Sequence, residues 1–271
     1  MNVYLYPSNT ETSLKNIYIG EYKRNWDLSK AIASNRTQFT IPQYSYEPIL
    51  SEDGTKMFIS LVIPRWNGVI AQYTLTTPFD ITTATNRTDY GSWLREYPNP
   101  CFADNWNKLF VWYGNNTTYA RFDLSSPYDL SSVNFSSPNA TFTMPADLWI
   151  MSVSADWKSF IYRPWSARSL TYAVSTTARE PVNSQTNLIS SSNVVCWVFC
   201  NRGEMMMFMD WTTINKYKFG TPYDLTTLNT TPIQTQSTGL SWNPWGIYVD
   251  KYGDNIYMTI GNTTIYRYNL I

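Results

Sequence analysis

Tryptophan and arginine stand close together in short segments that separate apolar stretches of the chain. Two such segments are PRWNG (64–68) and RPWSAR (163–168), and DWTT (210–213) carries a third tryptophan. An indole ring offers a large flat apolar surface, and a guanidinium group offers several hydrogen-bond donors. Together they could clamp a sugar ring or form the centre of a protein interface. The candidate binding residues are Arg65, Trp66, Tyr113, Arg163, Trp165, Arg168, Trp211, Trp242 and Trp245.

Enzyme chemistry has little support in this sequence, because it contains no histidine. That absence excludes histidine-based triads, histidine metal sites and acid–base catalysis by imidazole. A glycoside hydrolase would need two facing carboxyl groups. The apolar segments that we expect at the centre of the fold are poor in acids, and Glu47, Asp147 and Asp210 stand near their ends. We predict a non-enzymatic protein without metal or cofactor, and glycoside hydrolysis is a lesser alternative.

The composition favours a large β-sheet core. The 271 residues are 43% hydrophobic and 17% aromatic, with 20 basic and 20 acidic side chains. Aromatic and β-branched residues favour strands, and a net charge of zero argues against a nucleic-acid partner. Cys101, Cys196 and Cys200 are too few for a disulfide framework, so we expect buried apolar thiols. We expect neither a signal peptide nor a membrane insertion.

An internal repeat of about 50 residues organises the chain. The segment IAQYTLTTPFDITTAT (70–85) recurs as YARFDLSSPYDLSSVN (119–134) and as INKYKFGTPYDLTTLN (214–229). One aromatic residue anchors each of six copies: Tyr22, Tyr73, Phe122, Tyr172, Tyr217 and Tyr268. Their spacings are 51, 49, 50, 45 and 51 residues, which is too regular for chance.

A second motif lies between successive anchors and predicts a hairpin. PILSEDGTKMFISL (48–61) and PCFADNWNKLFVWY (100–113) each place turn-forming residues between two apolar runs. The anchor segment adds a third strand, and TQFTIP (37–42) and ATFTMP (140–145) represent a fourth. Four antiparallel strands in each repeat are typical of a β-propeller blade. The run of proline, an aromatic residue and aspartate (78–80, 127–129 and 222–224) then forms the turn between the third and fourth strands.

The number of blades depends on how the two ends of the chain are used. Residues 1–42 supply three strands without an inner one, and the last copy stops at Ile271 after its third strand. We predict one all-β propeller domain over 1–271 with six blades. The alternative is five blades, with the N-terminal strands pairing with TIYRYNLI (264–271) to close the ring.

The two motifs resemble a propeller repeat of tailed-phage virion proteins, especially tail and tail-fibre chains. The best matches are DGTKMF (53–58) and YTLTTPFDITTA (73–84), and weaker copies extend over nearly the whole chain. The pattern is lost at 172–182 and altered at 200–204. The resemblance implies a virion location, synthesis in the host cytoplasm, and a role in structure or host attachment. It implies no catalytic residue.

Two interpretations of the tryptophans remain open. In a propeller, the loops that follow the second and fourth strands share one face, where Trp66, Trp165 and Trp211 take equivalent positions. They could bind a partner there, or they could be wedged between blades as core. We predict a structural adaptor or decoration protein that contacts other virion proteins. The alternative is a receptor-binding module for a glycan or protein of the host surface.

Overall fold

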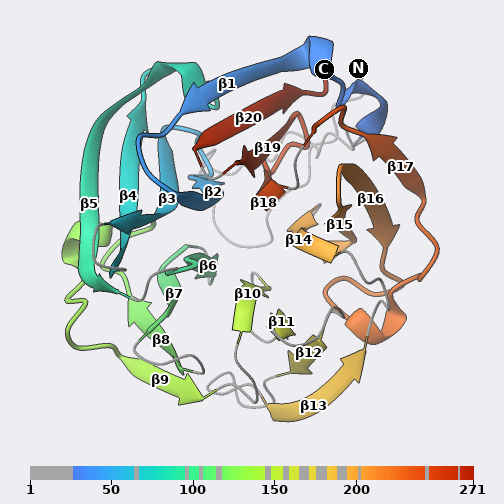
Figure 1. The fold of residues 1–271 in the computed structure, drawn as a ribbon. Coiled ribbons are helices and arrows are strands. Elements are labelled where there is room, and N and C mark those ends of the chain that lie inside the picture. Colours follow the sequence, from blue (N-terminus) through green and yellow to red (C-terminus); the bar gives the residue numbers. More distant parts are fainter. Residues whose placement is uncertain are drawn as a thin grey trace, which may run out of the picture.

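The computed structural model describes residues 27–271 except 64–66, 95–97, 104–105, 114–117, 144–147, 155–158, 165–170, 175–181, 188–193, 201–202, 242–243 and 262. In this part of the chain, strands β1 to β20 form five four-stranded antiparallel sheets around a central axis (Figure 1). The predicted all-β propeller architecture is confirmed.

Four of the sheets each consist of four consecutive strands. Sheet 1 contains β2 (Ser45–Leu50), β3 (Lys56–Ile63), β4 (Asn67–Leu75) and β5 (Ala84–Leu94). Sheet 2 contains β6 (Cys101–Ala103), β7 (Lys108–Trp112), β8 (Thr118–Asp123) and β9 (Ala140–Thr143). Sheet 3 contains β10 (Leu148–Val153), β11 (Ser159–Pro164), β12 (Thr171–Val174) and β13 (Val182–Asn187). Sheet 4 contains β14 (Val194–Cys200), β15 (Met205–Asp210), β16 (Thr213–Lys218) and β17 (Gln234–Ser237).

A closing sheet joins the two ends of the described chain. It contains β18 (Pro244–Val249), β19 (Asn255–Ile260), β20 (Thr264–Asn269) and, as its outer strand, β1 (Arg36–Thr40). The register pairs Arg36 with Tyr268 and Thr40 with Thr264, so the predicted pairing of the terminal strands is confirmed. The inner strands β2, β6, β10, β14 and β18 surround the axis, and the fourth strands lie at the rim (Figure 1).

The prediction of six blades is wrong. It treated the N-terminal and C-terminal copies of the repeat as separate blades. In the described residues, β1 instead completes the sheet of β18, β19 and β20. One sheet therefore uses strands from both ends of the sequence, and only the pairing between them reveals this. The copy around Tyr22 lies outside the described residues.

The turn that contains proline, an aromatic residue and aspartate after β4, β8 and β16 is structural, as its composition predicts. Its aromatic residue has a positive φ in three copies: 63° at Phe79, 60° at Tyr128 and 60° at Tyr223. The backbone N–H of Phe79 donates to the carbonyl of Gly54, 2.9 Å away, and Tyr223 donates to Gly203 at the same distance. These hydrogen bonds tie the turn to the hairpin of the same sheet.

The aspartate that follows the aromatic residue caps a short 3₁₀ helix. The carboxylate of Asp80 accepts from the backbone N–H of Thr82 at the start of η4 (Ile81–Thr83). Asp129 does the same for η5 (Leu130–Ser132), and Asp224 accepts from Thr226 in η7 (Leu225–Thr227). The side chain thus satisfies an N–H group that has no helical partner.

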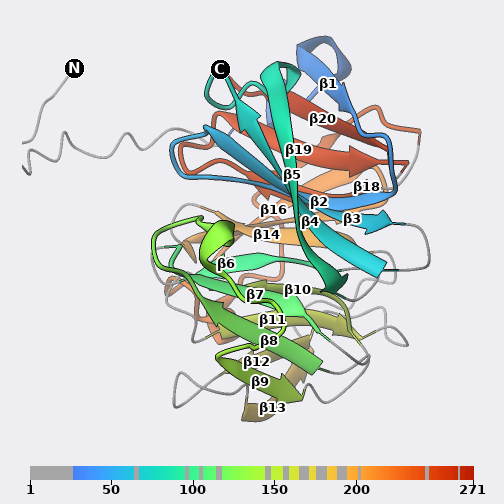
Figure 2. The ribbon, with the colours of Figure 1, turned by 90° about the vertical axis from the view of Figure 1, so that its left-hand side faces the viewer.

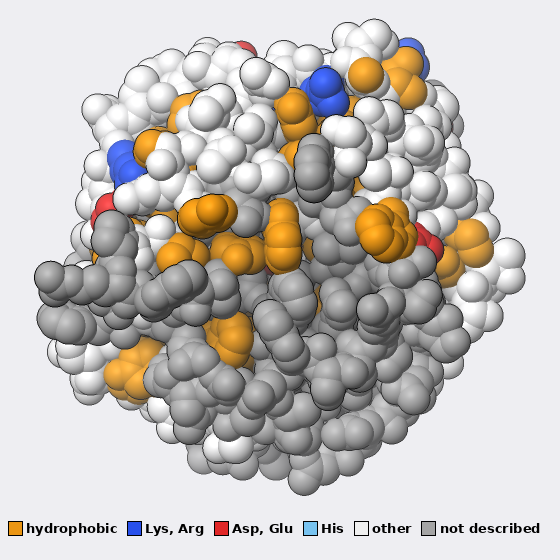
Figure 3. Space-filling view, in the orientation of Figure 1, with side chains coloured by type: hydrophobic (Ala, Val, Ile, Leu, Met, Phe, Trp, Pro, Cys, Tyr) orange, Lys and Arg blue, Asp and Glu red, His pale blue; other side chains and the backbone are white. Residues whose placement is uncertain are grey.

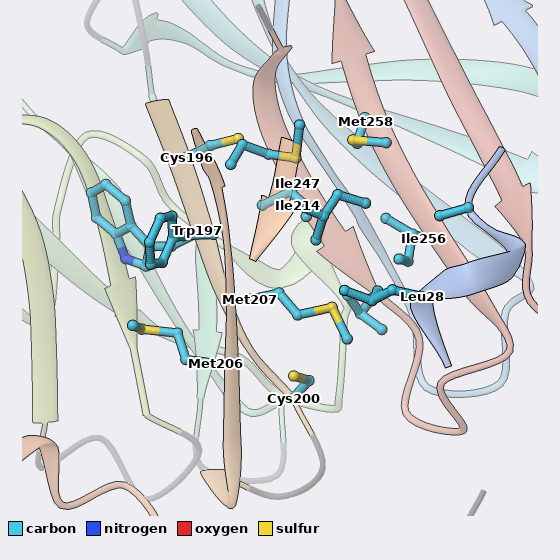
Figure 4. Packing of buried hydrophobic residues seen from close by; sticks show 14 of the residues in the cluster. Leu28, Cys196, Trp197, Cys200, Met206, Met207, Ile214, Ile247, Ile256 and Met258 are labelled. Atoms are coloured by element: carbon cyan, nitrogen blue, oxygen red, sulfur yellow. The ribbon is translucent and has the colours of Figure 1, made fainter. Parts of the chain in front are cut away.

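Apolar side chains fill the spaces between neighbouring sheets. Between sheet 4 and the closing sheet, the core contains Met207 on one side and Ile256 and Met258 on the other, whereas Trp197 and Met206 lie on the opposite face of sheet 4 (Figure 4). The three cysteines are buried and form no disulfide, which confirms their prediction as apolar core residues: Cys101, Cys196 and Cys200.

Residues 27–35, which precede β1, pack against the core between sheet 4 and the closing sheet. Leu28 in η2 (Leu28–Lys30) is fully buried in the same core, and η3 (Ala33–Asn35) leads into β1. The side-chain amide of Gln234 donates to Asp27 over 2.6 Å and accepts from Lys216 Nζ, also over 2.6 Å. The hydrogen bonds that Asp27 accepts from the backbone N–H of Ser29 and from Gln234 lower its pKa to about 2. The segment thereby attaches to sheet 4 before it enters the closing sheet.

Candidate functional site

One end of the ring carries the loops that follow the second and fourth strands, and we call it the loop face. Figure 2 shows β3 and β19 pointing toward this same end of the ring, and Figures 1 and 3 view it directly. Its described connecting residues are 41–44, 98–100, 113, 211–212, 238–241, 261 and 263. The opposite end carries the hairpin turns and the capped 3₁₀ helices, and we call it the turn face.

Two aromatic side chains project from the loop face. Tyr44, between β1 and β2, is 61% exposed, and Trp211, in the tight turn between β15 and β16, is 53% exposed. The carbonyl of Tyr44 accepts from the backbone N–H of Val62, 2.9 Å away. The Trp211 turn is fixed by Thr238, whose backbone N–H and hydroxyl both donate to the carbonyl of Thr212. Both rings are therefore presented from anchored backbone.

A third and a fourth aromatic ring meet beside the inner strands. The rings of Tyr46 in β2 and Trp245 in β18 pack edge to face, with centroids 5.8 Å apart and planes at 81°. Both side chains are partly exposed. They come from sheet 1 and the closing sheet, and Trp211 belongs to sheet 4, which is the closing sheet's other neighbour. Aromatic side chains on the loop face thus span three adjacent sheets.

The other predicted site residues fall into three groups. Tyr113 is partly buried and packs on the core of sheets 1 and 2, with its ring centroid 6.2 Å from that of Phe122. Arg163 lies in β11, opposite Ile150, where the structure describes only its backbone. The remaining five lie outside the described residues: Arg65, Trp66, Trp165, Arg168 and Trp242.

The described connecting residues of the loop face carry no formal charge. They read IPQY (41–44), PNP (98–100), Y (113), WT (211–212), TGLS (238–241), G (261) and T (263). Figure 3 shows several hydrophobic side chains and few charged ones among the described residues of this face. This described part suits contact with apolar groups of a partner.

The sequence places Tyr44 and Tyr46 on this face, after the fourth strand of a blade, and Tyr44 is its most exposed described aromatic side chain. Two other properties of this face were not predicted from the sequence. Trp211 has a φ of 54°, a conformation that no sequence pattern here indicates. Glu47, which the sequence places near the end of a central apolar segment, is buried beside Tyr46.

The described residues hold no group of three or more cysteine, aspartate or glutamate side chains that could bind a metal ion. Within the same residues, no helix has both the length and the apolar character needed to cross a bilayer.

Comparison with known proteins gives structural likeness alone. No protein-family model matches the chain, and no curated protein matches it. The β-propeller domain of Cps50 (Swd1) from Myceliophteria thermophila is similar, with a TM-score of 0.47 and 12% identity over 83% of this chain. A protein of unknown function from Desulfotomaculum acetoxidans gives 0.48 and 11% over 82%. The chain spans 65% and 64% of the lengths of these two proteins.

Proposed function

We propose that this protein is a non-enzymatic structural component of a virus particle, an adaptor or decoration protein that binds neighbouring virion proteins through the loop face. The assignment to a virion rests on the resemblance of its repeats to those of tailed-phage proteins. The assignment of the binding surface rests on one observation: Tyr44 and Trp211 project from a face whose described connecting residues are uncharged.

Exposed aromatic side chains of this size are costly to leave in water and are enriched at the centres of protein interfaces. Trp211 has a second cost, because a bulky residue rarely adopts a positive φ without strain. Asparagine or glycine would suit this backbone position better. The exposure of this ring is what supports a binding role, because a positive φ also occurs at aromatic residues of the turn face, such as Phe79 at 63°.

Host recognition is the second candidate, and the same rings favour it. An exposed indole can stack on the apolar face of a sugar as well as on a protein side chain. The adaptor needs a partner from the same particle, whereas a receptor-binding module needs only the host surface. Binding of the isolated protein to host cells or host glycans therefore separates the two candidates.

The adaptor proposal can be tested by assembly with altered side chains. Particles would be produced with Tyr44→Ala, with Trp211→Asn, or with Tyr252→Ala as the matched control. Tyr252 is also an exposed aromatic residue, at 46%, but it lies on the turn face. We expect the two loop-face variants to be lost from purified particles and Tyr252→Ala to be retained. Loss of Tyr252→Ala alone would move the interface to the turn face and contradict the proposal.

A further inference from the structure

Glu47 is an acid on the inner strand of sheet 1, where its backbone lies against Gly246 of the closing sheet. It belongs to the inner strand β2, and its side chain is only 8% exposed. It makes no hydrogen bond or ion pair with any residue that the structure describes. A charged carboxylate in such surroundings is costly, because it loses its hydration without gaining a partner.

The strands around Glu47 are held together closely on both sides of it. The hydroxyl of Thr259 in β19 donates to the carbonyl of Tyr46 over 2.7 Å, and the hydroxyl of Tyr248 in β18 donates to that of Leu50 over 3.0 Å. Gly246 approaches so closely that a Cβ atom there would lie 2.3 Å from Glu47 Cα. The strands packed against β2 therefore have little room to shift when the carboxyl group of Glu47 ionises.

Among the described residues, the groups that face Glu47 offer it no positive charge. They are the thiol of Cys101 in β6 and the phenols of Tyr119 in β8 and Tyr248 in β18. Burial raises the pKa of all three groups, so each is uncharged near neutral pH. Burial likewise raises the pKa of Glu47 well above its ordinary value of 4.5.

We propose that Glu47 links the stability of the ring to proton binding: the packing around β2 holds Glu47 as a neutral acid, and loss of its proton weakens that packing. This packing matters for the whole ring, because β2 begins the first complete sheet and lies beside β18, the first of the C-terminal strands. The inference concerns the ring itself and does not depend on what the loop face binds.

The direction of the pH effect follows from the raised pKa. The folded ring holds the Glu47 proton more tightly than the unfolded chain does. The stabilisation is therefore fully present below the ordinary glutamate pKa of 4.5 and is lost as the pH rises through the pKa of the folded state. A ring that is more stable at acidic pH is the expected behaviour.

Glu47→Gln tests the proposal, because glutamine has nearly the same shape and cannot ionise. Unfolding of both proteins by denaturant would be followed from about pH 5 to about pH 9, a range in which a raised glutamate pKa can titrate. Relative to Glu47→Gln, the folded-to-unfolded ratio of the wild type should fall by up to about tenfold for each pH unit. Identical pH profiles for the two proteins would overturn the proposal.

Two further measurements keep the test decisive if Glu47→Gln fails to fold. Infrared spectroscopy of the wild type at neutral pH should show a protonated carboxylic acid that disappears on unfolding, and only carboxylate bands in the folded protein would contradict the proposal. Cys101→Ala removes the facing thiol as another source of pH dependence. The decline with rising pH should persist in that variant, and its disappearance would assign the effect to Cys101.

Discussion

The two ends of the ring are built on different principles. The turn face repeats one solution: an aspartate caps a 3₁₀ helix after β4, β8 and β16, and the preceding aromatic residue folds back onto the hairpin. Ion pairs join adjacent elements there, such as Lys251 with Glu52 at 2.8 Å and Arg267 with Asp80 at 3.4 Å. The described connecting residues of the loop face lack charges and repeat no motif, and they leave Tyr44 and Trp211 exposed.

This difference separates the residues that serve the fold from the loops that we propose for binding. Residues that recur in several copies satisfy backbone groups and fill the space between sheets. Residues that vary between copies stand at the opposite end, on loops held by the rigid strands. Substitutions on the two faces should therefore have opposite consequences for stability and for partner binding.

The largest effect is expected from removing the strand that holds both ends together. Deletion of residues 264–271 eliminates β20, which lies between β1 and β19 in the closing sheet. The whole ring should lose its cooperative unfolding transition rather than fray at one end, as followed by circular dichroism during heating. A truncated protein that melts cooperatively near the wild-type temperature would contradict ring closure by this strand.

On the turn face, Gly54→Ala should cause a severe but local destabilisation. Gly54 has a φ of 71°, and a Cβ atom there would lie 2.5 Å from the ring of Phe79. The positive φ and the displaced ring together should lower the free energy of unfolding by about 2 to 4 kcal/mol. Denaturant unfolding measures this loss. The same substitution at Gly261, which has a positive φ and open space around it, is the control and should cost less.

Removing a helix cap on the turn face should have a smaller effect. Asp80→Ala removes the acceptor for the Thr82 N–H and the ion pair with Arg267, so we expect a loss of about 1 to 2 kcal/mol. Asp129→Ala removes an equivalent cap, whose aspartate forms no ion pair among the described residues. It should therefore cost somewhat less than Asp80→Ala. Equal or reversed losses would show that the ion pair adds nothing across the contact.

The smallest effect on stability should come from Trp211→Asn on the loop face. Asparagine tolerates the positive φ of this turn, so the free energy of unfolding should change by less than about 0.5 kcal/mol. Partner binding should nevertheless be lost, because the exposed indole is removed. A pull-down with the particle proteins checks the binding, and denaturant unfolding checks the stability. A variant that unfolds easily would assign Trp211 to the fold instead.

Much of the ring could be predicted from the sequence, because the repeat fixes local structure. The hairpin expected over 48–61 contains β2 and β3 with their turn, and the strand expected at 37–42 is β1 at Arg36–Thr40. The capping role of Asp80 followed from ordinary turn chemistry. These features depend on neighbours within a few residues.

The remaining features depend on contacts between distant parts of the chain. The number of sheets required the pairing of Arg36 with Tyr268, which repeat spacing does not specify. The burial of Glu47 depends on the approach of Gly246 from the other end of the sequence. The exposure of Trp211, compared with the packing of Tyr113, depends on what each loop meets in space. Similar residue types therefore have different environments in neighbouring repeats.

Imaging of purified particles that contain this protein, at side-chain resolution, tests the central claim most directly. If the loop face is the interface, Tyr44 and Trp211 will be buried against another virion protein, and the turn face with Tyr252 will be exposed. A particle in which the turn face is buried and both loop-face rings point into solvent would contradict the account.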